Sequence, residues 1–556
     1  MKNRIPQERL WMFPKVNKPV FTASAVIIVG FILFGAIFSD LANTLFVGAQ
    51  TLLTTYLGFT LVIFVNLLLI FVIMMAVGPF GDVRLGRMDE EAEYDLFSWT
   101  AMLFSAGIGI GLIYWGVAEP MYHYFAPPLT EAETLQSAQE AMSLAFMHWG
   151  FHAWAIYAVM ALALAYYHFR KGLPLTVRSA LYPLLGERIY GFWGDLVDVL
   201  AVFGTMFGIV TSLGLGAIQV NAGLNDVFGV PQNAFMQVLI IAGITFMATM
   251  SVIAGLDGGI KRLSNLNIIL TIVLLVFMVV VGPTLFIFDS FVDNYGRYLT
   301  DLVRLGTWNE GWTGGSWQNS WTIFYWAWWI SWTPFVGVFI ARISRGRTVR
   351  EFMVGVMLIP ASIMFFWFTA FGGTAIKISL DGDPALVEAT RENYAQTMFA
   401  LLDYFPLSSI MSMFAVVLII MWFVTSSDSG SFVIDMLTAG GDPDPPKVQR
   451  IFWAVAEGCV ASVLLVAGGL EALQAAAVVA GFPFAIVLAF ITFGLWRALR
   501  WDGLMVHRHR MRYRSDTEAD HNMPSEVNGP LFPDSFGQAH EEQGPPDAYG
   551  ERQPGE

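Results

Sequence analysis

The chain has 556 residues, of which 56% are apolar and 13% charged, and its mean hydropathy is +0.59. A soluble protein of this length would divide into domains and carry about twice that charged fraction. The composition therefore indicates a membrane protein. The single cysteine, Cys459, excludes an internal disulfide and the cysteine-based metal motifs.

Apolar runs of about twenty residues recur along the chain, and each is long enough to cross a bilayer. Residues 1–18 precede them as a basic arm without a signal-peptide cleavage site, so we expect this arm to be retained and cytoplasmic. Residues 19–80 hold the first two runs. The twelve runs have approximate centres at residues 29, 66, 107, 156, 205, 245, 277, 330, 365, 417, 460 and 484.

The distribution of Lys and Arg supports twelve spans with both termini inside. With that topology, 26 of the 30 Lys and Arg residues fall on the inner side and 4 on the outer side. Lys and Arg set the orientation of membrane proteins, whereas Asp and Glu contribute little, so the net charge of −14 does not oppose this topology. The C-terminal tail, residues 499–556, begins with a basic stretch at 507–514. It continues as an acidic, Pro- and Gly-rich segment that we expect to be largely disordered.

Spans 3–7 and 8–12 form two sets of five, at residues 95–290 and 319–498. Between them, residues 290–316 carry apolar side chains at helical spacing, which predicts an amphipathic helix on the outer surface. A five-span unit used twice in succession must be inverted the second time, which is the layout of many secondary transporters. In that layout the binding site lies near mid-membrane, where matching spans of the two sets are broken.

Span 3 carries the first expected break. Gly107, Gly109, Gly111 and Gly116 fall within ten residues, and each costs about 1 kcal/mol relative to Ala inside a helix. A dinucleotide-binding loop would need a preceding strand, which a membrane span excludes. Close helix packing through small residues remains an alternative. In span 8, Pro334 and Gly337 mark the second expected break.

Two spans present aromatic faces. In FYWAWWISWTPF (324–335), helical angles place Tyr325, Trp328, Trp329 and Trp332 within an arc of about 100°, with Trp326 outside it. A second group, HWGFHAWAIY (148–157), holds Trp149, Trp154 and Tyr157. Boxes of aromatic rings bind quaternary ammonium groups at about 0.5–2 kcal/mol per ring. Such a box requires no carboxylate, and burying one there would cost desolvation energy.

Two further patterns have competing interpretations. His148 and His152 stand four residues apart on one predicted helix face, which suits a metal site, but the pair lacks an obvious third ligand and is better explained as histidines that pack between helices. In WFVTSSDSGSF (422–432), at the expected end of span 10, the hydroxyl groups suit a small hard cation. Alternatively, this helix end tapers into water, with Asp428 near the inner membrane interface.

Three stretches, GIGIGLIYWGVAEPMYHY, HWGFHAWAIYAV and FYWAWWISWTPFVGVFIARISRGRTVREF, closely resemble the betaine/carnitine/choline transporter family, and the resemblance covers about residues 15–500. It implies an all-α membrane protein with 12 transmembrane helices: a leucine-transporter-like 5+5 inverted repeat preceded by two extra helices. Members are commonly homotrimers in the bacterial inner membrane. The resemblance also implies membrane lipids as partners, and neither enzymatic activity nor nucleic-acid binding.

The resemblance also implies a binding site. The substrate ammonium would lie in a box of Trp149, Trp154, Tyr157 and Trp329, with Trp328 and Trp332 nearer the inner side of the pathway. The unwound segment of span 3 would run from Ala106 through Gly107 and Ile108 to Gly111. The principal sodium site would use Ser105, Ile108, Thr425 and Ser426, with backbone near Trp422. A second sodium site would use Thr205, although Ile209 stands where a polar residue is expected.

Two residue identities narrow the expected substrate. Choline carriers of the family tend to have Asp at the position of Gly111, so glycine favours a zwitterion. Thr425 and Ser426 favour sodium symport over exchange. We therefore expect a sodium-coupled symporter for glycine betaine, with dimethylsulfoniopropionate or ectoine next, and no cofactor besides the coupling ion. Choline or carnitine transport by proton symport or exchange, a membrane osmosensor or receptor, and a metalloenzyme using His148 and His152 remain alternatives.

Overall fold

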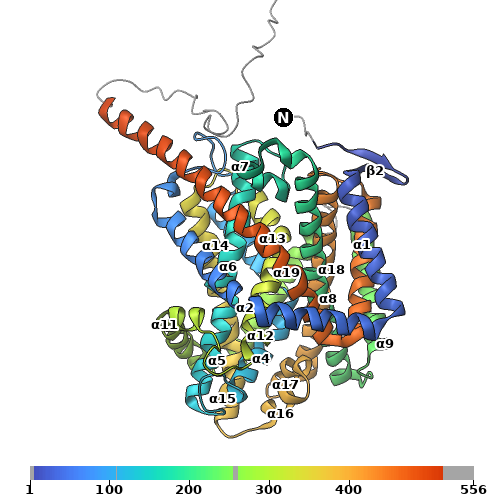
Figure 1. The fold of residues 1–556 in the computed structure, drawn as a ribbon. Helices are drawn as coiled ribbons and strands as arrows, with labels where there is room; N and C mark the ends of the chain where they lie inside the picture. The colour runs from blue at the N-terminus through green and yellow to red at the C-terminus, as the bar shows by residue number, and fades with distance from the viewer. Residues whose placement is uncertain (1–4, 108, 255–260, 517–556) are drawn as a thin grey trace, which may run out of the picture.

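The computed structural model describes residues 5–107, 109–254 and 261–516, which fold predominantly into helices (Figure 1). Strands β1 (Glu8–Leu10) and β2 (Phe13–Val16) pair as an antiparallel hairpin. This hairpin lies at the same end of the molecule as the C-terminal end of α19 (Figure 1). The α-helices are α1 (Lys18–Ile37), α2 (Ser39–Val77), α3 (Leu96–Gly107), α4 (Ile110–Phe125), α5 (Leu135–Trp149), α6 (Phe151–Ala165), α7 (Tyr182–Leu185), α8 (Phe192–Phe228), α9 (Ala234–Ala254), α10 (Lys261–Val281), α11 (Thr284–Thr307), α12 (Trp317–Ser320), α13 (Thr322–Arg342), α14 (Val349–Phe368), α15 (Thr374–Leu380), α16 (Ala385–Glu392), α17 (Thr397–Leu402), α18 (Ser408–Thr438) and α19 (Lys447–Asp516). Short 3₁₀ or π segments are η1 (Pro79–Asp82), η2 (Tyr166–Arg170), η3 (Val177–Leu181), η4 (Gly186–Tyr190), η6 (Thr369–Gly373) and η7 (Tyr394–Gln396).

Within the described ranges, nine helices are long and apolar enough to cross a membrane, or ten if one bent pair counts as a single span. That pair, Asn265–Val281 and Thr284–Thr307, bends by 109°. The longest candidate, Lys447–Gly503, contains non-helical backbone at Gly468 and Gly469, where two helices join. At about 1.5 Å per residue it is far longer than one crossing. The chain is therefore an all-α membrane protein; the twelve spans and the inverted repeat stay predictions.

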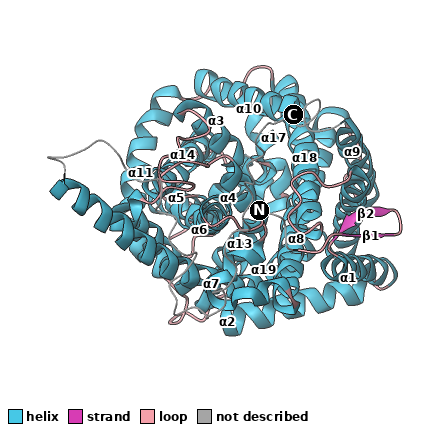
Figure 2. Ribbon diagram, turned by 90° about the horizontal axis from the view of Figure 1, so that it is seen from above, coloured by secondary structure: helices cyan, strands magenta, loops and turns pink. Residues whose placement is uncertain are grey.

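The centre of the bundle is formed by the helices that carry the two aromatic groups. In the most apolar window of Leu135–Arg170, 94% of residues are buried, against 28% for α1 and for Ala234–Ile253. Figure 2, which looks along the bundle, shows α4, α6 and α13 surrounded by the other helices. Helix α13 packs against α6, α8 and α19. Site residues on α13 are consequently held on several sides by other helices.

The third predicted span is divided where the glycines predicted a break. Helix α3 ends at Gly107 and α4 begins at Ile110. Gly109 between them has extended backbone, and Ile108 lies outside the described residues. The interruption is shorter than the predicted stretch from Ala106 to Gly111, because Ala106 and Gly111 both belong to helices. Residues 108 and 109 alone separate the two helices.

The expected break in span 8 is wrong, since α13 runs without interruption from Thr322 to Arg342. Pro334 lacks the N–H that would bond to the carbonyl of Ile330. The Thr333 hydroxyl donates to that carbonyl at 2.7 Å and supplies the missing hydrogen bond. Gly337 has a packing role, because a Cβ there would lie 2.6 Å from Cγ of Met160 on α6.

Span 4 contains a break that the sequence did not indicate. Helix α5 ends at Trp149, α6 begins at Phe151, and Gly150 between them has non-helical dihedrals. A Cβ on Gly150 would lie 2.3 Å from the Phe146 carbonyl oxygen, so any side chain would collide with the backbone. His148 and His152 therefore lie on different helices, which corrects the prediction that they share one helix face.

Candidate substrate-binding site

The aromatic residues predicted from the two spans line one cavity. Its volume is about 490 Å³, including the part open to solvent. Those of its lining residues that were predicted as site residues are Gly111, Trp149, Trp154, Tyr157, Trp328, Trp329 and Trp332. Gly109, Leu112, Ala153, Ser212, Val336 and Met364 complete the lining, so the described residues around the cavity include neither Lys nor Arg. An apolar cavity whose described lining holds neither Lys nor Arg suits a small ligand that carries its own positive charge.

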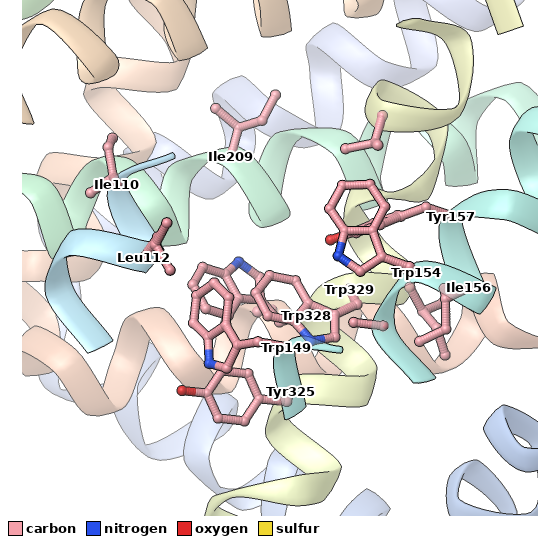
Figure 3. Packing of buried hydrophobic residues seen from close by; sticks show 14 of the residues in the cluster. Ile110, Leu112, Trp149, Trp154, Ile156, Tyr157, Ile209, Tyr325, Trp328 and Trp329 are labelled. Carbon is pink, nitrogen blue, oxygen red and sulfur yellow. The ribbon is translucent and has the colours of Figure 1, made fainter. Parts of the chain in front are cut away.

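Four rings, of Trp149, Trp154, Tyr157 and Trp329, form what we call the aromatic box (Figure 3). The ring centroids of Trp149 and Trp329 are 4.9 Å apart, and their planes are inclined by 69°. Tyr157 lies 6.2 Å from Trp329 and 5.5 Å from Trp154. All four side chains are at most 6% exposed. Neighbouring rings of the box therefore meet edge to face, and all four line the same cavity.

Backbone carbonyls of neighbouring helices fix the tryptophans of α13. Trp329 Nε1 donates to the carbonyl of His148 at 2.8 Å, and Trp328 Nε1 donates to the carbonyl of Gly208 at 3.1 Å. The Trp328 and Trp329 rings stack with centroids 4.6 Å apart. Trp326 points elsewhere and stacks on His152 at 5.5 Å. It is not among the cavity-lining residues, which agrees with its predicted angle outside the shared face.

Gly111 brings the N-terminal turn of α4 directly against the tryptophans. A Cβ on Gly111 would lie 3.0 Å from Cη2 of Trp149 and 3.0 Å from Cη2 of Trp328. A Cβ on Gly109 would meet none of the described side chains within 4 Å. The two glycines therefore differ: only Gly111 is required for the close approach of rings and helix.

Sequence reasoning missed Glu119, a fully buried carboxylate on α4. Its Oε2 accepts hydrogen bonds from Trp149 Nε1 at 2.7 Å and from the Tyr325 hydroxyl at 2.5 Å. His148 Nδ1 lies 2.6 Å from its Oε1. The available signal was an acid inside a predicted membrane span, because such residues are costly and commonly functional. From the sequence we expected that the box needs no carboxylate. The structure nevertheless places Glu119 beside it, with hydrogen bonds to three side chains.

Glu119, His123 and His148 offer three ligand atoms within 4.8 Å of one another. This cluster replaces the predicted pair of His148 and His152, because His152 Nε2 lies 3.2 Å from the Asn66 side-chain oxygen instead. The 2.6 Å separation between His148 Nδ1 and Glu119 Oε1 is that of a direct hydrogen bond. A proton shared between these two atoms joins them in a hydrogen bond, and that bond would have to break before both atoms could bind one metal ion.

The predicted residues of the principal sodium site fall on two helices. Trp422, Thr425 and Ser426 lie on α18. The Thr425 hydroxyl donates to the Met421 carbonyl at 2.9 Å and accepts from Asn267 at 2.8 Å. Trp422 Nε1 donates to the Thr271 hydroxyl.

The partners of these residues on span 3 are not fully described. Ser105 belongs to α3, whose last side chains are not described, and Ile108 lies outside the described residues. The structure therefore describes the α18 residues of the predicted sodium site but not the side chains at the end of α3, and the site stays a prediction.

Thr205, the candidate for a second sodium site, lies on α8 and is fully buried. Its hydroxyl has no hydrogen-bond partner among the described residues. Ile209, one turn further along, packs so closely against α18 that its Cδ1 would lie 2.3 Å from a Cβ on Gly430. The hydroxyl of Thr205 is thus available to a ligand, while Ile209 adds no polar group beside it.

The hydroxyl-rich segment does not end its helix, which corrects another expectation. Helix α18 continues to Thr438, and Asp428 is 1% exposed. Asp428 accepts from Ser251 at 2.7 Å and pairs with Arg450 at 2.5 Å. The charge of Asp428 is tolerated because it is paired within the protein, and its place near the inner membrane interface stays a prediction.

The comparisons with known proteins agree with this architecture. The model of the betaine/carnitine/choline family transporters matches residues 19–503. The chain belongs to this family. It is 43% identical over 484 residues to a glycine betaine transporter of Bacillus subtilis, covering 86% of this chain and 94% of that protein. It is 42% identical over 505 residues to a glycine betaine transporter of Acinetobacter baylyi, covering 90% and 76%. It is 44% identical over 502 residues to a glycine betaine/proline/choline transporter of Vibrio parahaemolyticus, covering 87% and 90%. The protein is therefore a multi-pass membrane transporter and not an enzyme.

Proposed function

We propose that this transporter carries glycine betaine by sodium-coupled symport, with dimethylsulfoniopropionate and ectoine as the next substrates. The observation that carries the proposal is the aromatic box, whose rings converge on a cavity lined by neither Lys nor Arg among its described residues. A trimethylammonium group cannot donate N–H hydrogen bonds, so ring faces are its natural partners. The similar proteins of Bacillus subtilis and Acinetobacter baylyi are named as glycine betaine transporters.

A zwitterion also needs a partner for its carboxylate. Helix α4 begins at Ile110, and the first-turn residues Gly111 and Leu112 line the cavity. The N–H groups at a helix N-terminus attract anions, and the helix dipole adds to this attraction. A betaine with its ammonium in the box and its carboxylate toward α4 would use both features.

Sodium coupling is supported by the hydroxyl groups of Thr425 and Ser426 on α18 and by the interruption between α3 and α4. A cation that bridges α18 and the end of α3 would restrain the divided span. Because α4 also forms one wall of the cavity, that restraint would favour the arrangement that binds substrate. If sodium raises the affinity for substrate in this way, thermodynamic linkage requires substrate to raise the affinity for sodium by the same factor.

We further propose that the protein resides in the bacterial inner membrane as a homotrimer with both termini in the cytoplasm. The excess of Lys and Arg on the predicted inner side supports this orientation. The hairpin β1–β2 and the far end of α19 lie at one end of the molecule, as this orientation requires (Figure 1).

The deciding experiment is uptake into proteoliposomes of labelled glycine betaine, choline, carnitine and ectoine, with and without a sodium gradient. We expect sodium-dependent uptake of betaine, and its loss in Trp329→Ala while the variant remains folded in the membrane. Betaine uptake that does not depend on sodium would rule out sodium symport and favour exchange or proton coupling. Wild-type affinity in Trp329→Ala would disprove the assignment of the box.

Choline is the second candidate substrate. Glu119 places a carboxylate directly behind Trp149, which would favour a substrate with a net positive charge. The similar protein of Vibrio parahaemolyticus is named for choline as well as betaine. Uptake of choline with a lower KM than betaine would establish this alternative.

A further inference from the structure

Glu119 connects the aromatic box to a group of buried polar side chains outside the cavity. The carboxylate is fully buried, and its Oε2 receives the N–H of Trp149 at 2.7 Å. Figure 3 shows the Trp149 nitrogen and the Tyr325 hydroxyl at the same end of the ring cluster. Trp149 is thus a box wall whose polar edge is fixed by an acid on another helix.

The histidine behind Glu119 completes its hydrogen bonding. His148 Nδ1 lies 2.6 Å from Glu119 Oε1, and its Nε2 lies 3.0 Å from the Thr322 hydroxyl. A neutral imidazole with the proton on Nδ1 donates to the carboxylate and accepts from Thr322. Trp149, Tyr325 and His148 then give the carboxylate three donors. An ionised acid can persist in a buried position when it is satisfied in this way.

We propose that Glu119 is a positioning residue of the box that also provides the negative charge opposing the substrate cation. The hydrogen bond fixes the plane of the Trp149 ring. Donation of its N–H to an anion polarises the indole and strengthens its attraction for a cation. The charge itself acts across a buried region of low dielectric, where Coulomb interactions are weakly screened. This inference rests on the proposed binding of an onium group in the box.

The proposal is distinguished from simple support of the fold by a pair of ligands with the same shape. Glycine betaine and its carbon isostere, 3,3-dimethylbutanoate, share the same carboxylate and differ in the positive charge. Loss of packing around Trp149 would weaken both ligands by the same factor. Loss of a negative charge would weaken glycine betaine alone. The ratio of their dissociation constants therefore reports charge recognition separately from shape.

The test variant is Glu119→Gln, in which the amide oxygen can still accept from Trp149 and Tyr325. The amide NH₂ can donate to His148 once that ring changes its tautomer, so the hydrogen bonds persist without the charge. The matched control is Glu140→Gln, on α5. Glu140 is also buried, and it accepts from the backbone N–H of Leu129 at 3.0 Å, away from the cavity lining.

Binding is measured on the purified full-length protein in sodium, from the change in tryptophan fluorescence. We expect wild type and Glu140→Gln to prefer betaine over its isostere by the same ratio, and Glu119→Gln to lower that ratio about tenfold. An unchanged ratio in Glu119→Gln would overturn the inference and leave the proposed function intact. Wild-type protein that binds neither compound would overturn the proposed function and this inference with it.

A second variant covers the case in which Glu119→Gln fails to reach the membrane. Glu119→Asp withdraws the carboxylate by one methylene group, and the ratio should fall about threefold. A purely structural role would leave the ratio at its wild-type value while both affinities decline.

Discussion

Gly111 offers a direct measure of how tightly the cavity is built. An added methyl group would lie 3.0 Å from ring atoms of both Trp149 and Trp328. Those rings are held by hydrogen bonds to Glu119 and to the carbonyl of Gly208, so neither can withdraw freely. The rings must therefore shift by a few tenths of an ångström and distort the box.

The expected magnitude follows from packing energetics. Insertion of one methyl group into a well-packed site costs about 1–3 kcal/mol. Replacement of glycine by alanine inside α4 returns up to about 1 kcal/mol through helix propensity. With the full return, about 0–2 kcal/mol remains, and a cost of about 1.4 kcal/mol within that range corresponds to an increase of about tenfold in KM for glycine betaine. Gly111→Ala should therefore weaken uptake while the protein remains folded.

Gly109→Ala is the matched control, because the same methyl group would meet no atom of the described residues within 4 Å and the extended backbone accepts any residue. We expect its KM to stay within threefold of wild type. Both variants are compared by betaine uptake in proteoliposomes and by thermal unfolding. Equal KM values for the two variants would refute the packing argument. A larger effect at Gly109 would show that the glycines serve flexibility of the divided span instead.

Five further variants, at four positions, probe the site and its supporting helix. Ser426→Ala should raise the sodium concentration needed for half-maximal uptake, and an unchanged requirement would place the coupling ion elsewhere. Trp326→Phe should leave betaine KM within twofold of wild type, whereas Trp329→Phe should raise it several-fold. The reason is that Trp329 lines the cavity and Trp326 is not among its described lining residues. Thr333→Val removes the donor to the Ile330 carbonyl and should cost about 1–2 kcal/mol of stability. Thr333→Ser should restore the melting temperature, and a Val variant as stable as wild type would contradict this role.

The sequence predicted the convergence of the aromatic residues better than the paths of the helices that bring them together. Periodicity identified the shared face of α13, and Trp326 does lie outside it. The prediction that residues 148–157 present one aromatic face assumed one continuous helix, which Gly150 interrupts. A lone glycine at that position carries no signal, because its requirement comes from contacts formed only in the folded chain, with the Phe146 carbonyl oxygen and with the Phe365 ring. Pro334 wrongly predicted a break in α13, because the Thr333 hydroxyl donates to the Ile330 carbonyl that the proline leaves without its backbone partner.

Glu119 shows a different limit of sequence reasoning. The cost of burying a carboxylate near a ligand site is real when the group is isolated. Three donors from two helices, α5 and α13, reduce that cost here, and their meeting with Glu119 on α4 depends on tertiary structure. Sequence alone therefore shows the energetic cost of burying Glu119 but not the hydrogen bonds that reduce that cost.

The interruption at Gly150 also has a consequence for the box. In a continuous helix the carbonyl of His148 would accept the backbone N–H of His152, four residues later. In this structure it accepts the indole N–H of Trp329 at 2.8 Å. The break thus provides a buried acceptor for one box wall on α13, while the same residue, through its imidazole, holds Glu119 behind another. Because both walls depend on the segment around His148, a movement of α5 relative to α6 would displace them together.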